Sequence, residues 1–172
     1  MKLHITPKAI FYVLVVVGIG VGLWYWHFVR TPEYLIKKQI HAIAEDVNKA
    51  PQETNTVMGF KMVAFLNRLA NHVEVSVHGI PIEGGFSGDE LGSHVSRGRM
   101  FADMIYLKPV EIYVTLIDDT HATAECELIA RATSKEGSYH LDEVYHLRLS
   151  LELDSAKHWV FTGFHESEFM EK

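Results

Sequence analysis

Four runs rich in β-branched and aromatic residues fill the C-terminal part of the chain, and only short gaps separate them. The runs cover residues 110–117, 121–133, 139–153 and 158–164. A parallel crossover needs a dozen or more residues, so gaps of this length connect antiparallel neighbours. The gaps also contain turn-forming residues, among them Asp118, Asp119 and Gly137. The chain is therefore predicted to build one antiparallel sheet, and everything before Val110 must anchor this sheet or cover a face of it.

The segment before the sheet begins with two helix patterns. Thr31, Pro32 and Glu33 suit a helix start, as the N-cap, the first helical residue and a first-turn acid. Apolar residues then recur at helical spacing up to about residue 49, just before Pro51. A second helix is predicted over residues 57–71, because apolar residues gather on one side of that stretch as well.

A short strand, a loop and a third helix complete the segment before the sheet. Residues 72–78 alternate valine with polar residues, which predicts a strand, and residues 79–86 are expected to form a loop. Ser87 and Glu90 make a capping box that opens a helix reaching about residue 105. Arg97 and Arg99 are expected on the solvated edge of this helix, and Pro109 closes it before the sheet begins.

The N-terminal stretch from residue 9 to residue 29 contains no Asp, Glu, Lys or Arg. A helix of this length, at ~1.5 Å per residue, spans the ~30 Å hydrocarbon core of a bilayer. Lys2 and Lys8 precede it, and residues 24–28 form an aromatic belt suited to a lipid–water interface. A cleaved signal peptide is the alternative, but it needs a cleavage site of small residues where these aromatic residues stand. The pattern favours an uncleaved transmembrane signal anchor.

This anchor determines the expected domain organisation. Residues 1–30 are predicted to form a short cytoplasmic tail and a single transmembrane helix, and residues 31–172 the folded domain. A short tail carrying Lys2 and Lys8, followed by a large domain, is typical of proteins whose tail stays in the cytoplasm. The domain is therefore expected outside the cytoplasm, on the periplasmic side of the inner membrane if the protein is bacterial.

Composition and charge argue against several classes of partner and site. A net charge of -6 disfavours nucleic acid, whose phosphates need clustered Lys and Arg. The one cysteine, Cys126, rules out an intrachain disulfide framework, and its row of small apolar residues predicts burial rather than reactivity. His140 and His146 share a strand face, but ~20 Å of strand separates them, so they cannot bind one metal ion. Neither a metal nor a cofactor is expected.

Element order and two short motifs resemble the nuclear-transport-factor-2-like (NTF2-like) superfamily. Residues 85–91, Gly-Phe-Ser-Gly-Asp-Glu-Leu, look like the loop and cap that enter its third helix. Residues 158–167, which begin His-Trp and end His-Glu-Ser, are similar to the last strand of its polyketide-cyclase-like (SnoaL-like) branch and of the association domain of calcium/calmodulin-dependent kinase II. The resemblance covers roughly residues 31–169. It implies an α+β, cystatin-like cone, in which three helices pack on a curved, mainly antiparallel sheet and enclose a cavity.

The alternation of side chains along each strand indicates which residues would face the pocket of such a cone. Glu143 interrupts an apolar row that also carries Tyr145, and His165 shares a row of the last strand with Trp159. A catalytic interpretation pairs Glu143 or His165, as general base, with Tyr113 or Tyr145 as hydrogen-bond donor to an enolate. The structural alternative is that twist or a bulge brings Glu143 to the rim. It is favoured, because no spacing in the sequence demands the catalytic pairing.

Two functions remain open at this point. The leading hypothesis is a membrane-anchored, non-enzymatic binding or assembly module that dimerises through its sheet and holds a small apolar ligand. The predicted anchor, the mostly apolar strand rows and the lack of a convincing acid–base constellation favour it. The competing hypothesis is a small isomerase or dehydratase that acts on an apolar substrate in the cone. The fold cannot choose between them, whereas an enclosed pocket that both Glu143 and His165 face would favour catalysis.

Overall fold

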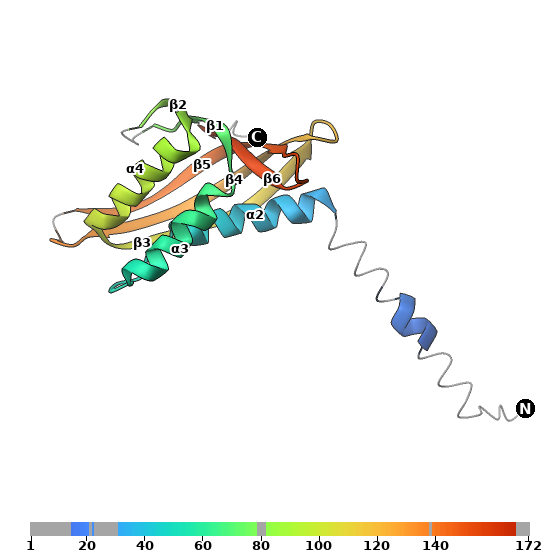
Figure 1. Ribbon diagram of the computed structural model, residues 1–172, viewed down its shortest axis with the longest axis horizontal. Helices are drawn as coiled ribbons and strands as arrows, with labels where there is room; N and C mark the ends of the chain where they lie inside the picture. Colours follow the sequence, from blue (N-terminus) through green and yellow to red (C-terminus); the bar gives the residue numbers. More distant parts are fainter. Residues whose placement is uncertain (1–14, 21, 23–30, 79–81, 138, 168–172) are drawn as a thin grey trace, which may run out of the picture. The chain divides into compact units, whose positions relative to one another are not determined.

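The computed structural model describes residues 15–20, 22, 31–78, 82–137 and 139–167. They belong to two units, Met1–Leu35 and Ile36–Lys172, of which the second carries the sheet (Figure 1). Residues 15–20 and residue 22 are helical, and the rest of the span predicted over residues 9–29 lies outside the described residues. In the described part of the chain, no helix is both long and apolar enough to cross a membrane.

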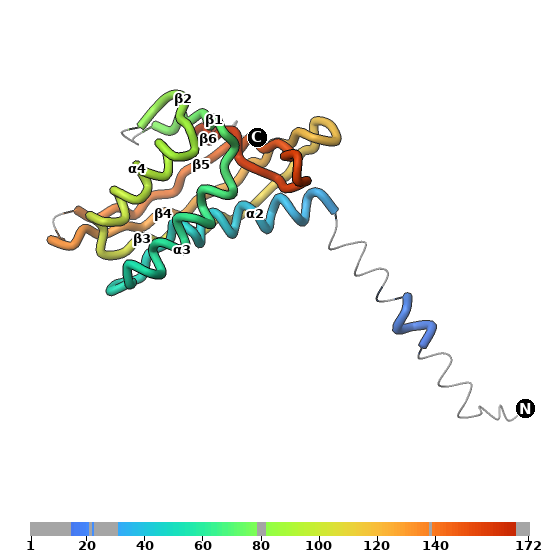
Figure 2. Tube along the Cα trace, in the orientation of Figure 1, coloured from blue at the N-terminus to red at the C-terminus, as the bar shows by residue number. Residues whose placement is uncertain are grey.

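The described strands form one six-stranded sheet in the order β2-β1-β6-β5-β4-β3. They are β1 (Leu69–Ser76), β2 (Gly84–Ser87), β3 (Ala102–Leu116), β4 (His121–Ser134), β5 (His140–Leu153) and β6 (Trp159–Glu166). Within this sheet β1 and β6 run parallel, and the other neighbouring strands are antiparallel. Figure 2 shows β3, β4 and β5 side by side, as their register requires. The predicted antiparallel sheet is confirmed.

Three helices of the described part, α2 (Pro32–Val47), α3 (Asn55–Leu66) and α4 (Gly88–Phe101), cover the same face of this sheet (Figure 1). Buried side chains from all three, such as Ile40, Phe65 and Leu91, meet the inner rows of the strands in one apolar core. The helix start predicted at Pro32 and the capping box at Ser87 are confirmed. The domain therefore has an α+β architecture, with its core between a helical layer and the sheet.

Two predicted helix ends and one predicted loop are wrong, and strand pairing is the reason in each case. The second helix ends at Leu66 rather than at residue 71, since the chain from Leu69 pairs with β6. The third helix ends at Phe101 rather than at residue 105, because the chain from Ala102 pairs with β4. Of the predicted loop over residues 79–86, residues 79–81 lie outside the described part, and residues 84–86 belong to β2, which pairs with β1.

β3 therefore runs through Pro109, which was predicted to stand before the first strand. Pro109 lies opposite Leu128 of β4. A proline offers no N–H to a ladder, and an edge strand such as β3 tolerates this because one of its sides has no strand neighbour in the sheet order. The register then shifts between Val110 and Tyr113, where Glu111 adopts a positive φ of 50°. This bulge bends β3 and changes which face its later residues occupy.

Arg99 is fully buried, so its predicted place on a solvated edge is wrong. Its Nη1 donates to the backbone oxygens of Asp46 (3.0 Å), Val47 and Asn48 (2.8 Å) at the end of α2, and its Nη2 pairs with Glu53. The last carbonyls of a helix lack partners within it and carry partial negative charge, which a cation offsets. Arg99 therefore joins the C-terminal end of α2 to α4.

Glu53 supplies the carboxylate of a buried cluster that Arg99, Glu53, Lys61 and Lys49 form between the ends of α2 and α4. It accepts a hydrogen bond from Lys61 Nζ at 2.8 Å in addition to its contact with Arg99. Burial acts to raise the pKa of Glu53, but the hydrogen bonds and charges of Lys61 and Arg99 outweigh it and hold this pKa below its ordinary value. Lys49, which follows α2, donates in turn to the backbone oxygens of Arg99 (2.8 Å) and Ala102 at the end of α4. The two helix ends thus cap each other.

Candidate apolar ligand-binding cavity

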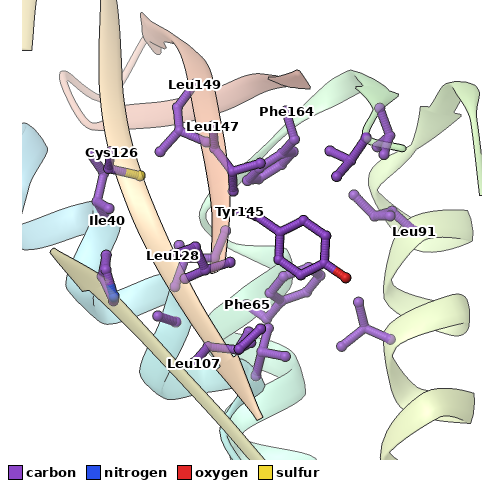
Figure 3. A pocket seen from close by; sticks show the side chains of 18 of the residues that line it. Ile40, Phe65, Leu91, Leu107, Cys126, Leu128, Tyr145, Leu147, Leu149 and Phe164 are labelled. Carbon is purple, nitrogen blue, oxygen red and sulfur yellow. The ribbon is translucent and has the colours of Figure 1, made fainter. Parts of the chain in front are cut away.

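A cavity of about 300 Å³ lies between the helices and the inner face of the sheet (Figure 3). The residues that line it come from all three helices, from β1, β3, β4, β5 and β6, and from the chain between β1 and β2. They are Ile40, Ile43, Ala44, Val47, Phe65, Val75, Val77, Ile82, Leu91, Val95, Leu107, Pro109, Cys126, Leu128, Ala130, Leu141, Tyr145, Leu147, Leu149 and Phe164. This lining set contains no charged residue. Protein pockets for small molecules begin at about this volume.

The small residues of β4 leave much of this space. Cys126 and Ala130 line the cavity from the inner row of β4, on either side of Leu128. Their neighbour β5 presents the longer side chains, with Leu147 opposite Cys126 and Tyr145 opposite Leu128. Burial raises the pKa of the Cys126 thiol to about 11, so the thiol stays protonated and is a poor nucleophile. The prediction that Cys126 is a buried small hydrophobe is confirmed.

Tyr145 supplies a hydroxyl to this apolar surface. Of the described side chains that line the cavity, only those of Tyr145 and Cys126 carry a polar atom. Tyr145 Oη donates a hydrogen bond to Glu143 Oε2 at 2.6 Å, and Figure 3 shows this oxygen directed toward the side of Leu91. Burial raises the pKa of Tyr145 to about 12, together with the hydrogen bond and charge of Glu143 and the charge of Glu166. The hydroxyl therefore remains protonated at neutral pH.

Glu143 lies in the predicted row but does not line the cavity. Leu141, Tyr145 and Leu147 of the same row do line it, so strand alternation places the inner face of β5 correctly. The Glu143 side chain is exposed, and its contact with the cavity passes through the Tyr145 hydroxyl. The carboxylate therefore stands at the rim, beside the polar atom of the lining.

His165 lies on the opposite face of the sheet from the one that alternation predicts. Phe161 pairs with Leu151, but Gly163 pairs with Ser150, so the register of β6 slips by one residue at this point. After this bulge Phe164, rather than His165, faces the cavity, and its ring stacks on Phe161 at 5.4 Å between centroids. An extra residue in one strand reverses the face of each residue that follows.

Tyr113 also lies away from the cavity. Its side chain is 65% exposed, and its partner on β4 is Glu125, whose side chain pairs with Arg148 on the outer face. The bulge at Glu111 precedes it and returns Ile112 to the core side. Of the four candidates from the sequence, the structure thus brings Glu143 and Tyr145 together and leaves His165 and Tyr113 on the outer face. No three metal-ligating side chains gather anywhere in the described residues.

No protein-family model matches the sequence, and no curated protein matches it either. Solved structures do match. One from Novosphingobium aromaticivorans, provisionally assigned as an aromatic ring hydroxylase, is 12% identical with a TM-score of 0.66 and aligns 81% of this chain with 90% of its own. Another from Streptomyces avermitilis, provisionally assigned as a dehydratase of the NTF2-like family, is 11% identical with a TM-score of 0.57 and aligns 80% with 95%. This chain has the NTF2-like fold.

The NTF2-like fold expected from residues 85–91 and 158–167 is thereby confirmed, and identities this low establish the fold alone. A third similar structure carries a different assignment, which is again provisional. It is a calcium/calmodulin-dependent protein kinase II association domain from Xanthomonas campestris, 14% identical, with a TM-score of 0.53, which aligns 80% of this chain with 85% of its own. Structures assigned to catalysis and to assembly therefore share this fold, and the residues of the site must decide between them.

The sequence predicted a cavity in this NTF2-like domain only through the family resemblance. It did not predict which small residues line the cavity, or that Tyr145 donates directly to Glu143. The small row of Ala124, Cys126 and Ala130 carried a usable signal, because small residues opposite long ones on a curved sheet leave space. The hydrogen bond from Tyr145 to Glu143 also follows from spacing, since residues two apart on a strand share a face. The slip at Gly163 has no such signal in the sequence.

Proposed function

We propose that this NTF2-like domain is a binding module that holds a small apolar ligand in its cavity. The main support for this proposal is the cavity of about 300 Å³, which is lined almost entirely by apolar side chains. An apolar cavity half that size, about 150 Å³, stays dry and binds benzene. By proportion, this cavity suits a ligand of roughly ten to fifteen non-hydrogen atoms.

The position of the ionisable groups favours binding over catalysis. A general base must come within hydrogen-bond reach of the proton that it removes. Of the predicted bases, His165 lies on the outer face and Glu143 at the rim. Within the described lining, the ligand body would meet aliphatic and aromatic side chains, which exclude water but transfer no proton.

Native mass spectrometry of the full chain, released from lipid nanodiscs, tests this proposal. We expect the wild-type protein to carry a small molecule from its host or from an added apolar mixture. Ala130→Leu fills part of the cavity and should lose that mass, whereas Ala156→Leu, in the exposed turn before β6, should keep it. No bound mass in the wild type, or equal retention by both variants, would refute the binding role.

The second candidate function is catalysis at the rim. The hydrogen bond of 2.6 Å between Tyr145 and Glu143 favours it, as do two similar structures provisionally assigned as a hydroxylase and a dehydratase. In this alternative Glu143 is the general base and Tyr145 donates to the developing oxyanion. Incubation of the retained ligand with the protein in heavy water distinguishes the two functions. Deuterium uptake that Glu143→Gln abolishes supports catalysis, and its absence leaves binding.

We further propose that residues 9–29 anchor the domain in a bilayer as an uncleaved helix, with the domain outside the cytoplasm. The charge-free stretch, the aromatic residues 24–28 and the leading Lys2 and Lys8 support this proposal. Alkaline extraction of membranes tests the anchor, and protease treatment of intact spheroplasts tests the orientation. Release at high pH, a mature form that lacks residues 1–30, or a domain protected from protease in intact spheroplasts speaks against it.

We also propose that the domain forms a homodimer through the outer face of its sheet. Val144 is 54% exposed there and lies opposite Ile129. Two ion pairs on the same strands flank this apolar centre, Arg131–Asp142 and Arg148–Glu125, each at 2.9 Å. An apolar centre within a charged rim is the usual composition of an interface, and a twofold axis would set this patch against itself. The assignment of one similar structure as an association domain is in line with this proposal.

A further inference from the structure

The polar end of the cavity offers acceptors and no spare donor. An ionised carboxylate only accepts hydrogen bonds, so the single hydroxyl hydrogen of Tyr145 is committed to Glu143 Oε2 at 2.6 Å. What remains for a ligand is the lone pair of Tyr145 Oη and the free lone pairs of the Glu143 carboxylate. A group that docks here must therefore donate a hydrogen bond.

The charge around this point is negative. Glu143 and Glu166 both act on Tyr145 through their charges, and Glu166 also accepts a hydrogen bond from the backbone N–H of His78 at 2.7 Å. Lys, Arg and His are absent from the described residues that line the cavity, so no lining cation offsets these carboxylates. A carboxylate on a ligand would meet two like charges at the edge of an apolar wall. Because both glutamates are exposed, solvent and salt screen this repulsion in part, and it is strongest at low salt.

We propose that the cavity selects ligands that have an apolar body and a hydrogen-bond-donating cationic head, such as a primary ammonium, and rejects carboxylates with the same body. The apolar body fills the space between β4, β5 and the helices, and the ammonium reaches Tyr145 Oη and Glu143 at the rim. This inference rests on the proposed binding function, because it assigns the class of ligand that the same cavity takes.

A matched series of ligands tests the selectivity. Butylbenzene, phenylbutanol, phenylbutylamine and phenylbutanoate share one body of a size that suits the cavity and differ in the head group. Each is titrated against the full chain in phosphatidylcholine nanodiscs, with the cavity-filled Ala130→Leu protein as the blank for binding to lipid. The alcohol also donates to the Glu143 carboxylate, so the amine gains only the added ion pair. At this exposed carboxylate the ion pair should tighten binding by up to about five-fold relative to the alcohol. The carboxylate should bind most weakly.

Two variants separate the contribution of the rim from general electrostatics. Glu143→Gln removes one charge beside Tyr145 and should reduce the ratio of amine to carboxylate affinity. Glu152→Gln removes the same charge from the same strand, roughly 30 Å along it at ~3.3 Å per residue, and should keep the ratio. An equal ratio in wild type and Glu143→Gln overturns the assignment.

The outcomes also separate this inference from the binding function. If butylbenzene binds the wild type but not Ala130→Leu, and the amine binds no better than the carboxylate, the cationic selectivity is refuted and the binding function stands. If no member of the series distinguishes wild type from Ala130→Leu, both are refuted.

Discussion

Arg99 is buried beside Glu53, whose side chain is itself largely buried. Arg99→Met keeps an aliphatic side chain but leaves this carboxylate without its guanidinium and the end of α2 uncapped. Removing one member of a buried ion pair costs about 3–5 kcal/mol. We therefore expect the free energy of unfolding to fall by that amount in chemical unfolding followed by circular dichroism. Arg97→Met, exposed on the same helix, should stay within about 0.5 kcal/mol of the wild type. Equal losses in the two variants would show that the buried cluster does not stabilise the fold.

Glu53 makes the same cluster sensitive to acid. Burial opposes the shift, but Lys61 and Arg99 hold the pKa of Glu53 below its ordinary value of 4.5 in the folded state. A depressed folded-state pKa contributes stability that is present above the unfolded value and is lost as the pH falls through the folded one. We expect the free energy of unfolding to decrease as the pH falls below about 4.5. In Glu53→Gln this decrease should be smaller. If the free energy of unfolding falls as steeply with acid in Glu53→Gln as in the wild type, Glu53 is not the group responsible.

The burial of a single residue was predictable from the sequence only where its neighbours on the same strand face are of the same kind. Cys126 stands among small apolar residues, so its burial followed from the sequence. Arg97 and Arg99 are different, because both are arginines in a polar part of α4 and helical geometry turns them about 200° apart. The pattern separates their faces but does not tell which face meets the end of α2, since that contact joins residues some fifty positions apart.

At the scale of elements, α3 and α4 approach each other closely at one glycine. A Cβ at Gly92 would stand 2.5 Å from Leu66 Cδ2, whereas a Cβ at Gly98 of the same helix would meet nothing within 4 Å. At Gly92→Ala the overpacking against Leu66, at about 1–3 kcal/mol, opposes a gain in helix propensity of about 0.5–1 kcal/mol, so we expect the free energy of unfolding to fall by up to about 2 kcal/mol. Gly98→Ala should raise it by about 0.5–1 kcal/mol through helix propensity. Thermal unfolding of the wild type and both variants measures these changes. If both variants are more stable than the wild type, or both less stable, the close approach of α3 and α4 at Gly92 is contradicted.

Elements were predictable from sequence, but their ends and irregularities were not. The long strands, the helix start at Pro32 and the capping box at Ser87 are local patterns, and the structure keeps them. The bulges at Glu111 and before Gly163 depend on how distant strands pair, and no local pattern marks them. Because a bulge reverses the face of the residues that follow it, strand alternation predicted the wrong face for His165.

At the scale of the whole molecule, the proposed dimer predicts a definite subunit count. Val144→Lys places two like charges near the twofold axis at the apolar centre of the outer face, where they repel each other. Native mass spectrometry of the full chain should report two copies for the wild type and one for this variant. Ala156→Lys adds the same charge in an exposed turn and should remain a dimer. One copy for the wild type contradicts the dimer.

The domain forms an apolar cavity between its helices and its sheet, and a small molecule can enter it. Methyl NMR of the full chain in nanodiscs under xenon pressure tests it most directly, since xenon occupies dry apolar cavities without polar contacts. We expect chemical-shift changes at the methyl groups of Leu128 and Leu147, which line the cavity, and none at Leu151, which is buried outside the lining. If the methyl shifts of Leu128 and Leu147 do not change under xenon, or if those of Leu151 change equally, the presence of an accessible cavity is contradicted.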